Sequence, residues 1–178
     1  MNYKILESNK IAIFGWPATG KTTLGQLLSR NLGIKLYSLD IIRWKYSENG
    51  IKNNERFLKD YKNIIKKDKW IIEGNALDYI DSRLEKADLL IFFESNIEEC
   101  IKNYTTREIK VKRKLEQRKN FDNKKTIKNI QDWIENRYSK KIEKLRPKLI
   151  NYKDKLIIVH NYKELDKLIE NFNEHKDG

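Results

Sequence analysis

The sequence predicts an α/β fold in three layers, with a five-stranded parallel sheet between two layers of helices. Short apolar runs of strand length alternate with longer stretches of helical period, and no hairpin signal joins two consecutive runs. Strands that alternate with helices are typical of parallel sheets, because a parallel connection needs a long crossover. Right-handed crossovers leave few ways to arrange five such strands.

Each element follows from its own pattern. The apolar runs KIAIF, IKLYSL, WIIEG, ADLLIFFE and KLIIVH predict buried strands at 10–14, 34–39, 70–74, 87–94 and 155–160. Helical period predicts helices at 21–32, 54–67, 78–86, 97–118, 126–150 and 163–172. In the fifth helix, Ile127, Ile130, Trp133 and Ile134 share one face. The stretch from 97 to 152 is expected as an excursion above the sheet.

Length and composition favour a single domain over residues 1–178. Hydrophobic residues make up 39% of the chain, which is sufficient for a core. No apolar run approaches the ~20 residues of a membrane span, and the N-terminal segment lacks the pattern of a secretory signal. Cys100 is the only cysteine, so an internal disulfide is excluded. We therefore expect a cytoplasmic protein without membrane contact, as a monomer or homodimer.

The formal net charge of +12 is concentrated in one stretch. Residues 107–125 contain nine basic and three acidic side chains, a net charge of +6, which is half of the total. This local excess predicts an anionic partner, either the phosphate groups of a small substrate or a polynucleotide.

The stretch GWPATGKT, residues 15–22, follows the first predicted strand and fits the phosphate-loop pattern G-x-x-x-x-G-K-[ST]. Its glycines allow backbone angles that turn successive N–H groups toward one anion, and the next helix adds its N-terminus. We expect Lys21 to bridge the terminal phosphates of ATP and to act in catalysis, and Thr22 to bind Mg²⁺. The predicted nucleotide-binding residues are Gly15, Pro17, Ala18, Thr19, Gly20, Lys21, Thr22 and Thr23.

The rest of the chain favours a compact kinase among phosphate-loop proteins. A small GTPase would need D-x-x-G and N-K-x-D motifs, and the stretch NKKT at 123–126 lacks the aspartate. A motor of the AAA class would need more chain for its lid domain. We therefore expect transfer of the γ-phosphoryl group of Mg-ATP to a small molecule, for which a nucleoside or nucleotide is a candidate. A basic helical lid at about 105–137 would close over both substrates.

Four further stretches support a family resemblance: YSLDIIRW (37–44), WIIEGN (70–75), SRLEKADLLIFF (82–93) and LRP (145–147). Together with the phosphate loop and in this order, they resemble adenylate-kinase-like phosphate-loop proteins, and among these the group named DNA topology modulation protein. The resemblance covers about residues 10 to 170 and implies the fold more than the substrate. The chain departs from the group in its lysine-rich lid and in Glu73, where many relatives carry aspartate.

Polar residues after the second and third strands are candidates for the reaction, because ligands of open parallel sheets bind at the carboxyl ends of strands. Asp40 would orient or deprotonate the acceptor hydroxyl, or hold Mg²⁺ through water; the alternative is a helix N-cap. Glu73 would bind Mg²⁺, and the alternative is a strand-end acid in solvent. Asn75 is expected to contact the acceptor.

Other candidates lie further from the phosphate loop. Trp44 is expected in the acceptor pocket, with a place in the core as the alternative. Arg83 is expected to reach the acceptor or a phosphate, and the alternative is a surface pair with Asp81 or Glu85. The loop at 160–162 is expected beside the adenine ring.

Arginines of the basic stretch are the candidates for binding the transferring phosphoryl group, because planar guanidinium groups bind phosphate oxygens bidentately. We assign Arg137 a catalytic role and Arg107 and Arg113 a substrate-binding role, with Arg118 as a further candidate.

The alternative function is a nucleotide-dependent regulator that binds DNA or RNA. Base stacking needs interleaved aromatic residues, and between 105 and 125 there is only Phe121. We therefore expect only weak, non-specific nucleic-acid binding.

Overall fold

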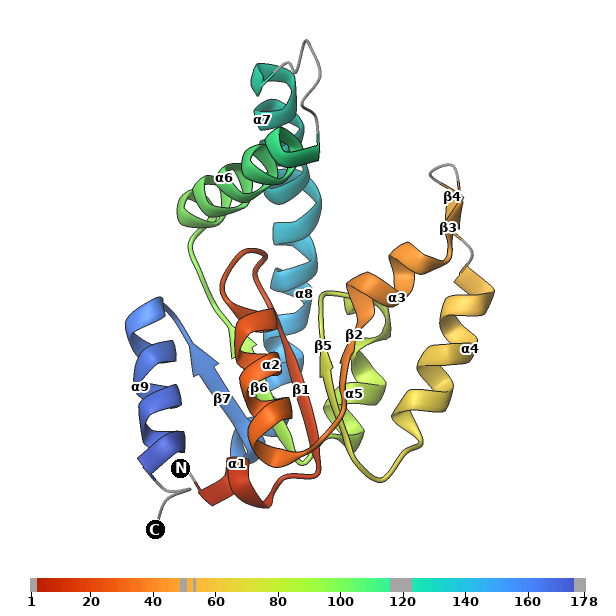
Figure 1. Ribbon diagram of the computed structural model, residues 1–178, viewed down its shortest axis with the longest axis vertical. Helices are drawn as coiled ribbons and strands as arrows, with labels where there is room; N and C mark the ends of the chain where they lie inside the picture. Colours follow the sequence, from red (N-terminus) through yellow and green to blue (C-terminus); the bar gives the residue numbers. More distant parts are fainter. Residues whose placement is uncertain (1–2, 49–50, 53, 116–122, 175–178) are drawn as a thin grey trace.

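A five-stranded parallel sheet forms the centre of the protein, as the sequence predicts (Figure 1). The computed structural model describes residues 3–48, 51–52, 54–115 and 123–174. The strands are β1 (Lys10–Gly15), β2 (Leu36–Ser38), β5 (Trp70–Glu73), β6 (Leu89–Phe93) and β7 (Leu156–Val159), in the order β2-β5-β1-β6-β7. β1 pairs with β5 and β6 and therefore carries the phosphate loop from the middle of the sheet.

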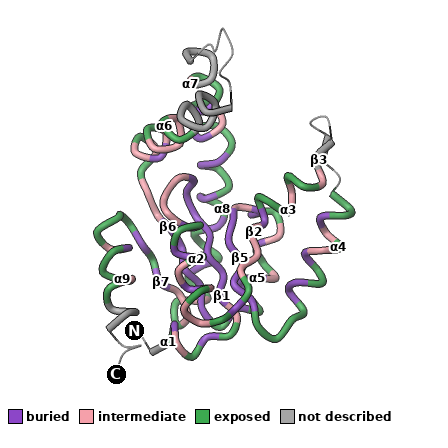
Figure 2. The backbone as a smooth tube through the Cα atoms, viewed as in Figure 1, coloured by how far each residue is buried: buried purple, intermediate pink, exposed green. Residues whose placement is uncertain are grey.

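Helices cover both faces of the sheet. One face packs against α1 (Tyr3–Glu7), α2 (Lys21–Leu32) and α9 (Tyr162–Glu174). The other packs against α3 (Leu39–Lys45), α4 (Asn54–Ile65), α5 (Ile80–Lys86) and α8 (Ser139–Leu149). Buried residues follow the strands and the inner faces of these helices (Figure 2). The three-layer arrangement is thereby confirmed.

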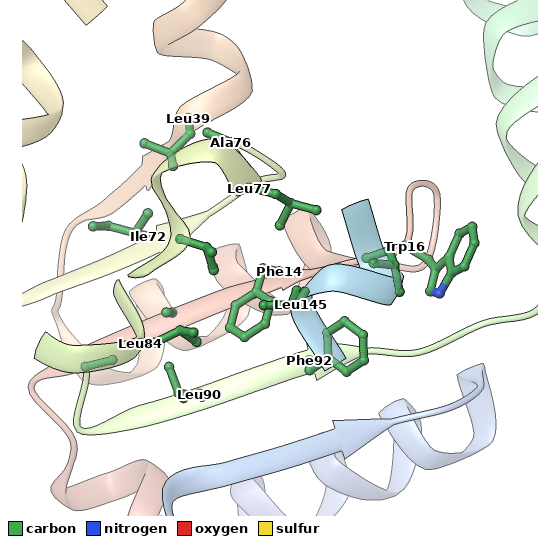
Figure 3. Packing of buried hydrophobic residues seen from close by; sticks show 14 of the residues in the cluster. Phe14, Trp16, Leu39, Ile72, Ala76, Leu77, Leu84, Leu90, Phe92 and Leu145 are labelled. Atoms are coloured by element: carbon green, nitrogen blue, oxygen red, sulfur yellow. The ribbon is translucent and has the colours of Figure 1, made fainter. Parts of the chain in front are cut away.

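Alternating side chains of the strands form two separate cores. Ile11 and Ile13 of β1 belong to the core beneath α2 and α9, whereas Ala12 and Phe14 belong to the opposite core. Figure 3 shows Phe14 packed among side chains that include Phe92 of β6. The two ring centroids lie 5.6 Å apart. Because both faces are buried, the strands are continuous apolar runs, which is what made them recognisable in the sequence.

A helical excursion extends beyond the carboxyl end of the sheet and returns along it (Figure 1). It consists of α6 (Ile97–Leu115), α7 (Asn123–Asp132), a π-helical turn labelled η2 (Trp133–Tyr138), and α8. The short 3₁₀ segment η3 (Ile150–Lys155) then leads into β7. The chain is helical from Asn123 to Leu149, as predicted for 126–150, but a π turn divides this helix and changes the helical phase after Asp132.

Short elements account for the other differences from the predicted fold. β2 ends at Ser38 because α3 begins at Leu39, and the 3₁₀ turn η1 (Leu77–Tyr79) precedes α5. A small hairpin, β3 (Ser47–Glu48) with β4 (Ile51–Lys52), was not predicted, although the Asn-Gly dipeptide between its strands is a hairpin signal. Within the described residues, no helix is long and apolar enough to span a membrane.

Candidate functional site: a phosphate loop at the edge of an open cavity

The phosphate loop connects the end of β1 to the first turn of α2. Its φ angles are positive at Gly15 (120°), Ala18 (58°) and Gly20 (96°). A side chain at position 15 is excluded, because a Cβ there would lie 2.2 Å from the carbonyl oxygen of Phe93 on β6. Positive φ at three nearby positions bends the chain into a concave loop of the kind that binds anions through its amide groups.

Four consecutive carbonyl groups of this loop are held by side-chain donors, three of which come from distant elements. The pairs are Tyr138 with Gly15 (2.8 Å), Thr19 with Trp16 (2.7 Å), Cys100 with Pro17 (3.0 Å) and Tyr162 with Ala18 (3.0 Å). Burial raises the pKa of Cys100 to about 12 and that of Tyr138 well above its usual value, so both donors keep their proton. The scaffold thus engages the loop's carbonyl oxygens. The Trp16 amide donates to the carbonyl oxygen of Phe93, so the amide groups after Pro17 are the ones left for an anion.

The N-terminus of α2 adds to this anion site. Gly20 occupies the N-cap position and no side chain caps the helix, so the first amide groups of α2 have no side-chain acceptor. Gly20, Lys21, Thr22 and Thr23 all line an open cavity of about 970 Å³. The positive end of a twelve-residue helix therefore faces the space that a phosphate would fill.

Lys21 is buried at the bottom of the cavity, with 6% of its surface exposed. Its ammonium group donates to the carbonyl oxygen of Trp16 and lies 3.4 Å from the Thr19 hydroxyl. Burial lowers the pKa of Lys21 to about 8; the charges of Glu73 and Asp40 oppose this shift, and that of Arg107 adds slightly to it. The lysine is thus a poorly solvated cation, which an arriving phosphate would stabilise.

Thr22 and Glu73 meet at the mouth of the phosphate loop. The Thr22 hydroxyl donates to Oε2 of Glu73 at 3.3 Å. Glu73 is 2% exposed, so the alternative of a strand-end acid in solvent is wrong. Burial raises the pKa of Glu73, and the nearby charge of Asp40 raises it further. A hydroxyl and a carboxylate are oxygen ligands that Mg²⁺ prefers, and Mg²⁺ commonly needs only one or two protein ligands beside substrate phosphates. The pair therefore fits a magnesium ion.

Asp40 and Asn75 form the wall of the cavity on the side of α3. Asp40 is exposed in the first turn of α3, and its carboxyl group packs against Gly74, where an added Cβ would lie 3.4 Å from it. The helix N-cap is Ser38, so the alternative of Asp40 as the cap is wrong. Asn75 follows Gly74, and its buried Oδ1 has no hydrogen-bond partner among the described residues. Both residues line the cavity, where Asp40 exposes its carboxylate and Asn75 keeps its Oδ1 buried.

Side chains of α6 and of the π turn line the opposite side of the cavity. Lys102, Tyr104 and Arg107 come from α6, and Trp133 begins the π turn. The Tyr104 ring lies 5.5 Å from the Trp133 ring, and the Arg107 guanidinium lies 4.7 Å from the Tyr104 ring. The predicted substrate-binding residue Arg107 is therefore placed at the cavity on an aromatic support.

The predicted adenine region adjoins the phosphate loop on the side of α9. Thr19, His160, Asn161 and Tyr162 line a small hollow beside the main cavity, and Tyr162 borders both spaces. Its hydroxyl is bound to the carbonyl oxygen of Ala18. The segment expected beside the base thus lies next to the loop expected to bind the phosphates.

Two predicted acceptor residues lie outside the cavity wall. Trp44 is 79% exposed in the last turn of α3, so its alternative place in the core is wrong. Arg83 is fully buried, and its terminal nitrogens donate to the carbonyl oxygens of Gly74 and Ala76 at 2.9 Å each. The alternative of a surface ion pair between Arg83 and Asp81 or Glu85 is therefore wrong. Arg83 holds the turn that carries Asn75, which is a positioning role rather than a contact with substrate.

The predicted phosphate-binding arginines are placed differently from one another. Arg107 lines the cavity, whereas Arg137 is exposed in the π turn and does not. Arg113 belongs to α6, but its side chain lies outside the described residues, as does the whole of Arg118. The catalytic role of Arg137 and the binding role of Arg113 remain predictions.

Several residues that shape the site were not predicted from the sequence. Tyr138, Cys100 and Trp133 act on the phosphate loop or the cavity from the helical excursion. The sequence pattern marked these residues only weakly, because an aromatic or thiol side chain on the apolar face of a helix is typical of a core position. Trp133, expected on the core face of the fifth helix, packs against the core and also lines the cavity. The π turn is the feature that a structure adds, and such turns are frequent at functional sites.

Comparison with known proteins places the fold. No family model matches the chain, and no curated protein sequence matches it. A shikimate kinase from Bacteroides thetaiotaomicron superposes with a TM-score of 0.53 at 15% identity, over 96% of this chain and 99% of that one. A shikimate kinase from Acinetobacter baumannii, solved in complex with shikimate, gives 0.51 at 16% identity, over 80% and 83%. The chain therefore has the fold of the phosphate-loop kinases.

Proposed function

We propose that this protein is a kinase that transfers the γ-phosphoryl group of Mg-ATP to a hydroxyl group of a small molecule. One observation carries the proposal: the phosphate loop, with its carbonyl groups held by the scaffold, opens into a cavity that also exposes the carboxylate of Asp40. A binding site for phosphates and a base for a hydroxyl would thus share one cavity. The kinase fold of the neighbours supports the same reading.

The nucleotide would bind mainly through backbone groups. The loop amides and the N-terminus of α2 would hold the phosphates, with Lys21 between the terminal two. Thr22 and Glu73 would hold Mg²⁺, which supplies charge neutralisation for the phosphates. Adenine would lie beside Tyr162, at the edge of the main cavity that this residue borders.

The acceptor would bind on the side of α3. Asp40 would accept a hydrogen bond from the acceptor hydroxyl, orient it toward the γ-phosphorus and take its proton as the new bond forms. Asn75 would fix the acceptor's position. The helical segment from α6 to the π turn would act as the lid, with Arg107 on the phosphates, because closing such a segment excludes water from the reaction.

The direct test is a screen for ATP consumption over nucleosides, nucleotides and sugars, each compared with the rate without acceptor. We expect at least one acceptor to raise ATP consumption with stoichiometric product, and the variant Lys21→Met to show no acceptor-dependent rate. Rates that stay at the background for every acceptor, with ATP bound tightly, would contradict a kinase.

The resemblance to the DNA topology modulation group, together with the basic stretch at 107–125, suggests the alternative of a nucleic-acid-binding regulator. The side chains at 108–125 of this stretch lie outside the described residues, so a DNA-binding measurement is the test of this alternative. We expect weak DNA binding whose affinity falls steeply with salt, with a log–log slope near −0.9 per neutralised phosphate. Tight binding at physiological salt without nucleotide would favour the regulator. Gel filtration would decide between monomer and homodimer.

A further inference from the structure

The two sides of the cavity differ in chemistry. The side of α6 carries the cations Lys102 and Arg107, whereas the side of α3 and β5 carries Asp40, Glu73 and Asn75. No lysine or arginine of α3, β5 or the turn after β5 lines the cavity. In Figure 1, α3 lies on the side of the phosphate loop away from α9, where the base is expected. The acceptor would therefore meet the anionic side.

The cations of the cavity belong to the nucleotide. Lys21 lies in the phosphate loop itself. The charge of Arg107 acts close to the phosphate loop. Burial raises the pKa of Cys100 and of Tyr162, which donate hydrogen bonds to Pro17 and Ala18, and the positive charge of Arg107 opposes this rise in both residues. These positions suit the phosphates of ATP, and Lys102 also lies on the α6 side. Among the described side chains, none of the lining cations therefore stands on the side of α3 to bind a second anionic ligand.

The cavity wall formed by Asp40 and Asn75 is called the acceptor wall. The arginines closest to it in sequence already make other contacts. Arg83 donates to the carbonyl oxygens of Gly74 and Ala76 and is fully buried. The guanidinium of Arg43 lies over the ring of Phe57, 4.8 Å from its centroid, and does not line the cavity. Neither can reach a carboxylate or phosphate in the cavity without giving up these contacts. Among the described side chains, which leave out those of 108–126, a phosphorylated or carboxylated acceptor would meet Asp40 with no cation beside it.

The acceptor wall instead requires hydrogen-bond donors. The Oδ1 of Asn75 is buried and has no partner among the described residues, which is a costly state unless a ligand supplies the donor. The carboxyl group of Asp40, which packs against Gly74 next to Asn75, offers two further accepting oxygens. Hydroxyl groups are the donors that match such a wall, and several of them on one molecule would satisfy both side chains together.

Building on the proposed kinase function, we propose that the acceptor is an uncharged molecule with several hydroxyl groups, such as a nucleoside or a free sugar, and not a nucleoside monophosphate or a carboxylic acid. One hydroxyl binds Asp40 and receives the phosphoryl group; its proton passes to Asp40 as the bond between the γ-phosphorus and the bridging oxygen of ADP breaks. A neighbouring hydroxyl donates to Asn75. The product carries the charge that the wall repels, which favours its release.

The test uses matched pairs of acceptors that differ only in charge: a nucleoside and its 5′-monophosphate, and a hexose and its hexuronic acid. Product formation with Mg-ATP gives kcat/KM for each, and titration in the presence of a non-hydrolysable ATP analogue gives affinity. We expect the neutral member of at least one pair to be preferred by 10-fold or more. Equal or better use of the charged members would overturn the proposal while the kinase function stands. If no member of either pair is phosphorylated or bound, this result would contradict the kinase function itself, and the proposal with it.

A charge-bearing variant sharpens the result. Asn75→Lys places a cation on the acceptor wall, and we expect it to reduce or reverse the preference for neutral acceptors. Asn103→Lys places the same charge on the α6 side of the same cavity and serves as the matched control. A change of preference that is equal in the two variants would show that the wall at Asn75 does not select the acceptor.

Discussion

The phosphate loop and the helical excursion α6–η2 border the same cavity but are built differently. The loop lies at the end of the central strand, and three separate elements fix its carbonyl groups. The excursion presents its cavity-lining side chains, such as Tyr104 and Arg107, from a helix that extends beyond the sheet (Figure 1). Two of these anchors, Cys100 of α6 and Tyr138 of η2, belong to the excursion itself. The part that binds the common substrate is thus tied to the part expected to close over it.

The largest expected effect comes from the centre of the loop. Lys21→Met should reduce acceptor phosphorylation to the background rate, because it removes the only charge of the loop. The same change should stabilise the protein without ligand. Burial lowers the pKa of Lys21 from 10.5 to about 8, which corresponds to about 3 kcal/mol against the charged form. Denaturant unfolding at pH 7 should therefore give a free energy of unfolding higher by roughly 1–3 kcal/mol, less what the lost hydrogen bonds contribute.

The pH dependence separates this charge effect from a packing effect. Between pH 8 and 10.5 the unfolded chain holds a proton on Lys21 that the folded protein has lost, so the free energy of unfolding of the parent should rise with pH in this window. In Lys21→Met this rise should be absent. Parallel pH profiles of parent and variant would contradict the assignment of the buried charge.

The second prediction concerns the acceptor wall. Asp40→Asn keeps the side-chain size but removes the base, so acceptor phosphorylation should fall by roughly 10²–10⁴-fold. ATP affinity should stay within a few-fold of the parent, because the loop and α2 bind the phosphates. Nucleotide titration and a product assay on the same preparation measure both quantities. If transfer survives in Asp40→Asn, the catalytic assignment is wrong and Asp40 only shapes the wall.

The third prediction compares two arginines of the excursion. Arg107 lines the cavity, so Arg107→Ala should lower kcat/KM for ATP by about 10-fold, the effect of losing one charge-assisted hydrogen bond. Arg137 is exposed outside the cavity, so Arg137→Ala should change the same quantity by less than about 3-fold if the arrangement of the excursion persists during turnover. A larger loss in Arg137→Ala would show that closure carries Arg137 to the phosphates, as the sequence predicts.

The same contrast explains what could be predicted from the sequence. Helix α2 matches the predicted range 21–32, and β1 differs by one residue, because a buried run followed by a glycine-bordered turn is a local pattern. The loop's anchors could not be predicted, since Cys100, Tyr138 and Tyr162 lie far from it in sequence. The orientation of Arg137 depends on the π turn, whose insertion shifts every later side chain around the helix axis, and no residue type marks its position.

Tyr138 joins the two regions, and its variant tests how strongly they are coupled. Tyr138 closes the π turn, donates to the carbonyl oxygen of Gly15 and packs its ring 5.8 Å from that of Trp16. Tyr138→Phe keeps the packing but leaves the Gly15 carbonyl without this donor, a loss of about 1 kcal/mol.

Because the lost contact holds the binding loop, we expect the Kd for ATP to rise about fivefold, a change that corresponds to the same free energy. Tyr152→Phe, in η3 at the other end of α8, removes a hydroxyl of equal size away from the loop and should leave the Kd unchanged. If both variants bind ATP like the parent, the loop keeps its shape without the hydrogen bond from Tyr138. A rise confined to Tyr138→Phe would mean that movement of the helical segment is transmitted to the phosphate site through this one hydroxyl.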